Sequence, residues 1–192
     1  MTNPFIHTAS GGKFVYGSRD TDVRLEDVAK HLSQVNRFCG ASIYPYSVAQ
    51  HSVIVVKVLR KVFSVRDPHT LKFGLLHDAH EYVINDQPTP FQEWFRDEVC
   101  GGVDFLEIAK ERIDRIILPK LGLAWPVPES DREVVHLADK ASFVIEAARL
   151  FKEVPLWLDT YKRRFSFPAN LEHIDIDLSP MVSSDAEALF LK

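Results

Sequence analysis

Near the middle of the chain stands the segment Leu75-Leu76-His77-Asp78-Ala79-His80-Glu81-Tyr82-Val83-Ile84. If this segment is helical, His77 and Glu81 lie one turn apart on the same face, with Asp78 beside them. The apolar neighbours indicate that these polar side chains are largely buried. Burying an imidazole next to carboxylates costs several kcal/mol unless they are compensated, and a divalent cation is the usual compensation. The alternative is a hydrogen-bonded core histidine beside an aspartate that accepts backbone N–H groups.

The composition fits one globular domain over residues 1–192. Apolar residues make up 46% of the chain and charged residues 26%, which is typical of a folded protein with a single core. The net charge of −4 and the lack of any Lys/Arg block argue against nucleic acid as a partner. We expect no signal peptide and no membrane span, since no apolar run approaches about 18 residues. Only two cysteines occur, which favours a reducing cytoplasm over a disulfide scaffold.

The spacing of apolar residues predicts an all-α fold, with a small β-hairpin in residues 1–22 that turns at Gly11-Gly12. Capping-box spacings at Ser47 and Ser130, and the pair Asp67-Pro68, mark helix starts. The expected hairpin strands cover residues 6–8 and 14–16. The expected helices cover residues 25–38, 47–61, 67–85, 91–95, 104–118 and 130–152, and a last one follows Ser179-Pro180.

Two histidines and two aspartates stand out as candidate metal ligands. They fall on three of the expected helices, each in an apolar context. Two imidazoles and two carboxylates suit Mn, Fe, Co, Ni, Zn or Mg, and they do not suit Cu(I) or an iron–sulfur cluster. The four residues are His51, His77, Asp78 and Asp139.

The order H…HD…D resembles the HD-domain superfamily of metal-dependent phosphohydrolases. The similarity is closer to its short single-domain nucleotidases, which include bacterial 5′-deoxynucleotidases and phage-encoded deoxynucleoside triphosphohydrolases, some acting on dATP. It covers roughly residues 8–150 and implies an HD-domain helical bundle. The blocks that carry it are, in order, Arg37-Phe38, Tyr46-Ser47-Val48-Ala49-Gln50-His51-Ser52, His77-Asp78-Ala79-His80-Glu81 and Asp86-Gln87-Pro88-Thr89-Pro90.

The resemblance implies a role for each matched residue. Glu81 matches the catalytic glutamate that positions or deprotonates the attacking water, a task that suits a carboxylate close to a bound cation. Arg37 matches an arginine that binds the phosphate through its planar fork of donors. Asp86 matches an aspartate near the sugar or the attacked phosphorus. One divalent metal ion is implied, with His51, His77, Asp78 and Asp139 as its ligands.

Two positions depart from the pattern of this group. Gln92 stands where relatives often have a lysine after the Pro-Thr-Pro loop, which removes a charge that would neutralise phosphate. Phe38 stands where relatives often have tryptophan, which leaves a smaller platform for the base or sugar. We therefore count both among the substrate-binding candidates, with Arg37 and Asp86. Lys13 or a residue of a partner subunit is a possible source of the missing charge.

For the other polar and aromatic residues near the motifs, we favour structural or solvent-exposed positions over direct roles in the site. His80 invites a second metal ion, but no further ligand set is visible, and a surface or outer-shell role is favoured. For His136, a position next to the metal ligands and a position in solvent are equally favoured. Glu146 stands two turns after Asp139, and a solvated helix face is favoured. The aromatic residues Phe91, Trp94, Phe95 and Trp125 are expected in the core.

The sequence thus predicts a metal-dependent hydrolase that converts 2′-deoxynucleotides into nucleoside and phosphate or triphosphate. The small-molecule substrate, a homo-oligomeric state and a cytoplasmic location (the host cytoplasm for a phage protein) follow from the resemblance. Base, phosphate number and physiological metal stay open. The alternative is a non-catalytic, metal-stabilised nucleotide sensor or interaction protein. Glu81 argues against it, because a sensor has no use for a group that activates water.

Overall fold

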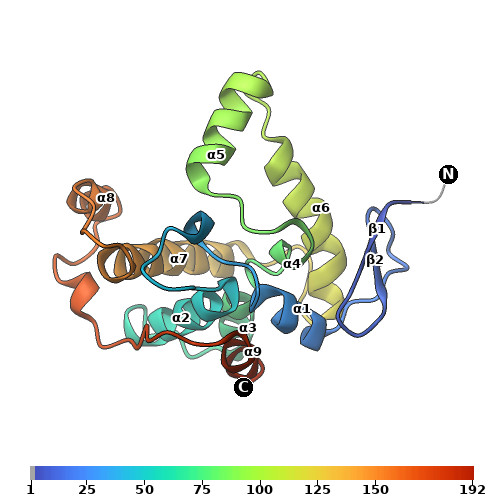
Figure 1. Ribbon diagram of the computed structural model, residues 1–192, viewed down its shortest axis with the longest axis horizontal. Coiled ribbons are helices and arrows are strands. Elements are labelled where there is room, and N and C mark those ends of the chain that lie inside the picture. Colours follow the sequence, from blue (N-terminus) through green and yellow to red (C-terminus); the bar gives the residue numbers. More distant parts are fainter. Residues whose placement is uncertain (1–2) are drawn as a thin grey trace.

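The computed structural model describes residues 3–192 and confirms a mainly helical fold with a small N-terminal hairpin (Figure 1). Among these residues, no helix is long and apolar enough to cross a membrane. Short 3-10 turns η1 (Phe38–Gly40) and η3 (Leu171–His173) and a π-helical turn η2 (Phe95–Val99) join the longer elements. The strands are β1 (Phe5–His7) and β2 (Lys13–Val15), and the helices are α1 (Leu25–Leu32), α2 (Val48–Lys61), α3 (Pro68–Leu76), α4 (Glu81–Ile84), α5 (Thr89–Trp94), α6 (Phe105–Lys120), α7 (Glu129–Leu150), α8 (Leu158–Arg164) and α9 (Ser183–Phe190).

Helix α2 lies at the centre and packs against α3, α7 and α9. It begins where the sequence predicts, because Ser47 and Gln50 form a capping box. The Ser47 hydroxyl accepts from the Gln50 N–H at 3.3 Å, and the Gln50 side chain accepts from the Ser47 N–H at 3.1 Å. Most of its residues are buried, as expected for a helix enclosed by three others.

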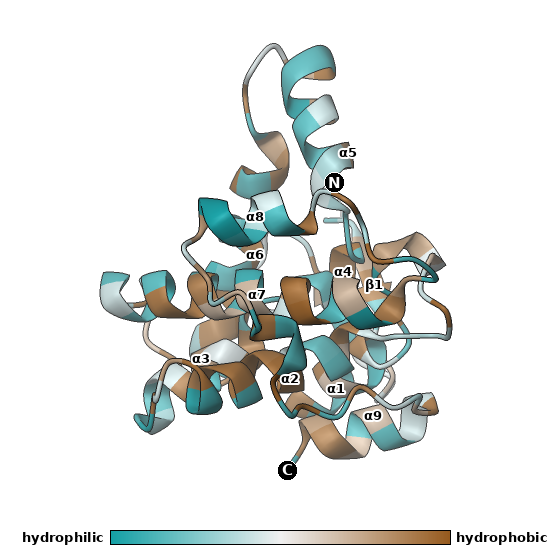
Figure 2. Ribbon diagram, turned by 90° about the vertical axis from the view of Figure 1, so that its left-hand side faces the viewer, coloured by the Kyte–Doolittle hydropathy of each residue, from teal (hydrophilic) through white to brown (hydrophobic). Residues whose placement is uncertain are grey.

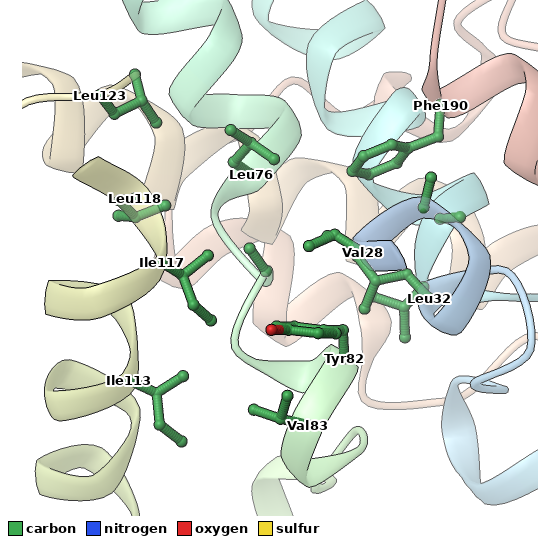
Figure 3. Packing of buried hydrophobic residues seen from close by; sticks show 14 of the residues in the cluster. Val28, Leu32, Leu76, Tyr82, Val83, Ile113, Ile117, Leu118, Leu123 and Phe190 are labelled. Carbon is green, nitrogen blue, oxygen red and sulfur yellow. The ribbon is translucent and has the colours of Figure 1, made fainter. Parts of the chain in front are cut away.

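The core has two parts on either side of α2. One lies between α1, α4, α6 and α9, where apolar side chains point at one another (Figure 3). The other joins α2 to α7 and to the C-terminal segment. Fully buried members of the first part include Val28, Leu32, Leu76, Ile117 and Phe190, and those of the second include Tyr46, Val55, Leu59, Ile145 and Leu150.

The hairpin is confirmed with a small shift in its strands. β1 and β2 pair antiparallel with Ile6 opposite Phe14, and each strand is displaced by one residue from the expected range. Backbone hydrogen bonds between Thr8 and the Gly11-Gly12 turn close the loop. Phe14 is fully buried in the first part of the core, so the hairpin packs onto the domain through this residue.

Three differences from the predicted helices affect the surroundings of the site or the start of α7. The expected helix 25–38 ends at Leu32, and the expected helix 67–85 is broken between α3 and α4 by the turn at residues 77–80. The spacing from Ser130 to Glu133 is not a capping box, because α7 begins at Glu129 after Pro128 and has no side-chain cap.

An arm formed by α5, η2 and α6 projects from the domain (Figure 1). Hydrophilic colours dominate its outer turns, with hydrophobic residues between them (Figure 2). Phe91 is 39% exposed and Trp94 is 55% exposed, so the prediction that they belong to the core is wrong. Phe95 is half-buried on the same arm, stacked on Phe91. Trp125 does pack against the first part of the core.

Candidate metal centre

Three elements bring the predicted ligands to one point. His51 comes from the first turn of α2, Asp139 from the middle of α7, and His77 and Asp78 from the turn after α3. Nε2 of His51 lies 3.1 Å from Oδ1 of Asp139 and 3.7 Å from Oδ2 of Asp78. Nε2 of His77 lies 3.1 Å from Oδ2 of Asp78 and 4.0 Å from Oδ1 of Asp139. The four side chains therefore face a single small space.

Close packing of α3 on α2 sets the distance between the two histidines. A Cβ atom on Gly74 would lie 2.4 Å from a Leu59 methyl group, so glycine allows the helices to approach here. The turn after α3 then directs the next residues toward α2. The rings of His51 and His77 come to lie 5.3 Å apart between their centroids.

The other nitrogen of each histidine already has an acceptor. Nδ1 of His51 lies 2.6 Å from Oε1 of Glu146, and Nδ1 of His77 lies 2.9 Å from the Gly74 carbonyl. With a proton on each Nδ1, the lone pair on each Nε2 faces the shared space. Within residues 3–192, both Nε2 atoms are buried and have no partner that meets the full geometry of a hydrogen bond, although a carboxylate oxygen lies 3.1 Å from each. This is the arrangement of metal-binding histidines held by an outer acceptor.

The spacing of the four groups fits one cation. Bonds of about 2.1 Å to nitrogen and oxygen place neighbouring ligand atoms about 3 Å apart and opposite ones about 4 Å apart. The four measured distances run from 3.1 to 4.0 Å. The buried, unpartnered Nε2 atoms give the independent reason to expect a cation, so these residues fit a divalent metal ion.

Glu146 is part of the site, and its predicted solvated position is wrong. Its side chain is fully buried, accepts a hydrogen bond from the Tyr46 hydroxyl at 2.9 Å and lies 3.4 Å from Nη2 of Arg37. Burial raises the pKa of Glu146, but His51 and Arg37 outweigh it and hold this pKa below its usual value. Glu146 therefore stays charged and holds both the histidine and the arginine in place.

Arg37 reaches the same space from the segment before η1. Its side chain is 12% exposed, and Nη1 lies 3.8 Å from Oδ2 of Asp78. Burial alone would lower the pKa of Arg37, yet Glu146, Asp139 and Asp78 raise it above its ordinary value. The guanidinium therefore keeps its charge beside the candidate metal ligands.

The turn at residues 77–80 changes the expected relation of His77 to Glu81. Backbone bonds from Ala79 N–H to the Leu76 carbonyl and from Glu81 N–H to the Asp78 carbonyl tighten the chain into a turn. Glu81 then opens α4, which ends at Asn85 with φ 63°. The two residues consequently do not share the face of one continuous helix, although both stay at the site.

Glu81 and Asp86 are two further carboxyls among the charges of the site. Burial, Asp78 and Asp86 raise the pKa of Glu81 well above its usual value. Glu81 is 6% exposed, and its Oε2 has no hydrogen-bond partner in the described part of the chain. Burial also raises the pKa of Asp86, while Arg37 lowers it. The charged groups of the site therefore change the pKa of both carboxyls.

His80 is buried next to α6, whereas His136 is exposed on α7. His80 is buried, and its Nδ1 lies 3.1 Å from Oδ2 of Asp114 on α6. Burial lowers the pKa of His80, but the hydrogen bond to Asp114 outweighs this and raises it. His80 is therefore no surface residue. His136, on the outer face of α7, is exposed to solvent.

Gln92 does have a lysine beside it, which comes from α6. Nζ of Lys110 donates to Oε1 of Gln92 at 2.6 Å. The charge of Lys110 also lowers the pKa of Glu81 and Asp86, although burial and the neighbouring carboxylates dominate both. Lys13, the source suggested from the sequence, lies instead over the Phe5 ring in the hairpin at 4.2 Å. No local sequence signal links Lys110 to the Pro-Thr-Pro loop.

An aromatic cluster borders the site on the other side. The Phe38 ring lies 5.1 Å from Phe151 and 6.2 Å from Phe143, measured between centroids. Trp157 stacks on Phe143 at 5.5 Å and is 45% exposed. Phe143 stands one turn after Asp139 on α7, a spacing that could have marked it from the sequence. Trp157 has no such signal, because it lies in the irregular segment before α8.

The sequence was compared with models of protein families and with known proteins. No model of a known protein family matches it. A protein of Rhodobacter capsulatus, described as uncharacterised, is 29% identical over 131 residues, which are 67% of this chain and 63% of that protein. YfdR of Escherichia coli, also described as uncharacterised, is 30% identical over 168 residues, which are 79% of this chain and 86% of YfdR. With this identity over most of both proteins, the chain belongs to the same family as YfdR.

Proposed function

We propose that the chain is an HD-domain phosphohydrolase that removes phosphate or triphosphate from 2′-deoxynucleotides with the help of a divalent metal ion. One observation carries the proposal. The buried Nε2 atoms of His51 and His77 lack hydrogen bonds within residues 3–192 and face two carboxylates at 3.1 to 4.0 Å. The motif order that resembles short HD nucleotidases supports the substrate class.

The metal ion would be held by His51, His77, Asp78 and Asp139. When bound, the ion would lower the pKa of a water molecule and polarise a phosphoryl oxygen. Glu146 keeps the lone pair of His51 Nε2 directed at this position by accepting from Nδ1. The Gly74 carbonyl does the same for His77.

Glu81 is the group that accepts the proton of the attacking water. It is one of the few carboxylates at the site that is not a proposed ligand of this ion. Burial and then Asp78 and Asp86 raise the pKa of Glu81, and a cation at the neighbouring ligands would favour its ionised form, which can accept a proton. A carboxylate oxygen of Glu81 takes the proton as the water oxygen bonds to phosphorus; the bond from phosphorus to the 5′ oxygen breaks, and this oxygen takes up a proton and leaves as the nucleoside hydroxyl.

Two cations are proposed to bind the phosphate chain. Arg37 offers a planar fork of donors next to Asp78, which suits the phosphoryl group under attack. Lys110 offers a point charge on the arm, next to Gln92. Because Glu146 already balances Arg37, Lys110 is the cation that best suits the outer phosphates of a longer chain.

The aromatic cluster of Phe38, Phe143 and Trp157 is the proposed platform for the nucleoside. Trp157 exposes 45% of its surface while its ring stacks on Phe143, so its free face is open to a base. Phe38 adjoins Arg37 directly, and the guanidinium carbon lies 5.3 Å from its ring centre. A substrate whose phosphate meets Arg37 therefore has apolar surface next to it.

The test is turnover of all deoxynucleoside mono- and triphosphates by protein stripped with a chelator and then supplied with Mn²⁺ or Co²⁺. Phosphate, pyrophosphate and triphosphate are measured separately. We expect metal-dependent release of nucleoside with either phosphate or triphosphate. Nucleotide binding without any turnover under both metals would contradict the proposal and favour a sensor.

A further inference from the structure

A second group of metal-ligating side chains lies on the turn between α3 and α4. Asp78, His80 and Glu81 each direct one ligand atom to a common region, and these atoms lie within 4.8 Å of one another. The three residues come from one short stretch, because the tight turn at residues 77–80 brings them together. The sequence alone shows no such group, since it predicts a continuous helix through this stretch.

His80 is oriented for a cation by a residue of α6. Its Nδ1 lies 3.1 Å from Oδ2 and 3.2 Å from Oδ1 of Asp114, and the ring is buried. A proton on Nδ1 leaves the lone pair on Nε2 as the free ligand atom. A carboxylate that holds the outer nitrogen of a histidine is the usual support of a metal ligand.

An unpartnered oxygen of Glu81 is a second, independent indication of a cation in this group. Only 6% of the surface of Glu81 is exposed, and its Oε2 has no hydrogen-bond partner among the described residues. A buried carboxylate oxygen without a partner costs free energy, and a cation is one of the groups that compensates it. The oxygen belongs to the same side chain that contributes to the group of three.

Asp78 connects this group to the first site. Its Oδ2 lies 3.1 Å from Nε2 of His77, while one of its oxygens also belongs to the group with His80 and Glu81. A carboxylate has two oxygens and can bridge two cations. Arg37 and Lys110 lower the pKa of the neighbouring carboxyls Glu81 and Asp86, so both cations stand near this group.

We propose that Asp78, His80 and Glu81 hold a second divalent cation, which shares Asp78 with the ion at His51 and His77. One imidazole and two carboxylates suit Mn²⁺ and similar ions. Ions that share a carboxylate lie about 3.5–4 Å apart and together stabilise the attacking and leaving oxygens of a phosphoryl group. One oxygen of Glu81 serves this cation, and its other oxygen accepts the proton of the water. The inference rests on the proposed function, because it needs the first ion as a neighbour.

The experiment counts Mn²⁺ bound to the full chain. Chelator-treated protein is dialysed against increasing Mn²⁺, bound metal is measured by atomic emission, and the electron paramagnetic resonance spectrum is recorded at saturation. We expect two ions per chain and a spectrum of two coupled Mn²⁺ ions. Coupling separates a shared site from ions that bind loosely to surface carboxylates.

Variants then identify the ligands. His80→Ala should reduce the count from two to one and remove the coupling. Asp114→Asn, which keeps the volume of the side chain and an oxygen acceptor for His80, should retain two ions but bind the second about 10–100-fold more weakly. The matched control is His69→Ala, since His69 also pairs with an aspartate, Asp131 at 2.9 Å, but lies away from the site. It should keep two coupled ions.

The outcomes separate the two proposals. One ion in the wild-type protein, lost in His51→Ala and kept in His80→Ala, overturns the second cation and leaves the proposed function intact. No bound ion in the wild-type protein overturns both. If His80→Ala does not fold, as judged by circular dichroism, the wild-type count and the coupling still decide.

Discussion

The site has two sides that are built differently. On the side of α2 and α7, His51 and Glu146 are fully buried, and Tyr46 and Arg37 complete their contacts. On the side of α6, Asp78 and Asp114 keep 18% and 15% of their side-chain surface exposed, while Asp139 on α7 keeps 22%. We call these the α7 side and the α6 side.

The difference separates two tasks. On the α7 side, His51, Arg37 and Glu146 contact one another through at least one atom each, which supports the candidate ligands, although Arg37 Nε and Glu146 Oε2 have no hydrogen bond among the described residues. On the α6 side, Glu81 Oε2 lacks a partner in the described chain, and Lys110 meets only an amide oxygen within hydrogen-bonding distance. Groups with unused bonding capacity are the ones that can serve a substrate. We therefore expect the α7 side to govern metal binding and stability, and the α6 side to govern turnover and substrate choice.

The largest effect is expected from removal of a ligand. His77→Ala should lose bound metal and lower nucleotide turnover by more than about 100-fold, since even an outer partner of a metal ligand is worth about 10–100-fold. Metal content and turnover are measured together, with His69→Ala as the control. Full metal occupancy at the wild-type rate would show that His77 is no ligand.

Next in size is the loss of the proposed proton acceptor on the α6 side. Glu81→Ala should keep the ion at His51 and His77 but lower turnover by about 10²–10⁴-fold, the range for a positioned base. Glu93→Ala, an exposed glutamate on α5, serves as the control and should be unchanged. If Glu81→Ala instead loses all metal, Glu81 is a ligand of the first ion.

The two sides should also differ in their contribution to stability. Glu146→Ala leaves Arg37 charged and buried without its partner, and breaking such a pair costs about 3–5 kcal/mol. Asp114→Ala should cost less, about 1–3 kcal/mol, because His80 can lose its proton whereas an arginine cannot. Urea unfolding of both variants measures the difference. Equal losses would remove the distinction between the two sides.

The smallest effect concerns the phosphate chain. Lys110→Gln should lower kcat/KM for a deoxynucleoside triphosphate by about 10-fold, since a charge-assisted hydrogen bond is worth about 1.5–3 kcal/mol and Lys110 is half-exposed. The monophosphate should lose less, and Lys120→Gln on the same helix should change neither. An equal loss for both substrates would mean that Lys110 acts on the site and not on the outer phosphates.

Much of the α7 side could be predicted from the sequence. The capping box at Ser47 fixes the start of α2 and hence the position of His51. Glu146 was misjudged, although it stands seven residues after Asp139 and thus on the same face of α7. Its burial depends on Arg37 and Tyr46, which come from a distant part of the chain, so local polarity could not reveal it.

The α6 side was harder to predict. The apolar pattern of residues 67–85 favours one helix, but the structure breaks it at residues 77–80 with a hydrogen-bonded turn that this pattern does not indicate. Lys110 meets Gln92 only because α5 and α6 fold back on each other as an arm. The exposure of Phe91 and Trp94 has the same origin, since nothing near them in sequence indicates that the arm projects.

The most direct measurement for the central claim is the anomalous diffraction of a crystal grown with Mn²⁺. The account predicts a peak at about 2.0–2.3 Å from Nε2 of both His51 and His77, with Asp78 and Asp139 beside it. A second peak next to His80 would support the shared site as well. A map without a peak between the two histidines, with their rings bonded directly to Asp78 and Asp139, would contradict the metal centre and leave a buried cluster of charged residues in its place.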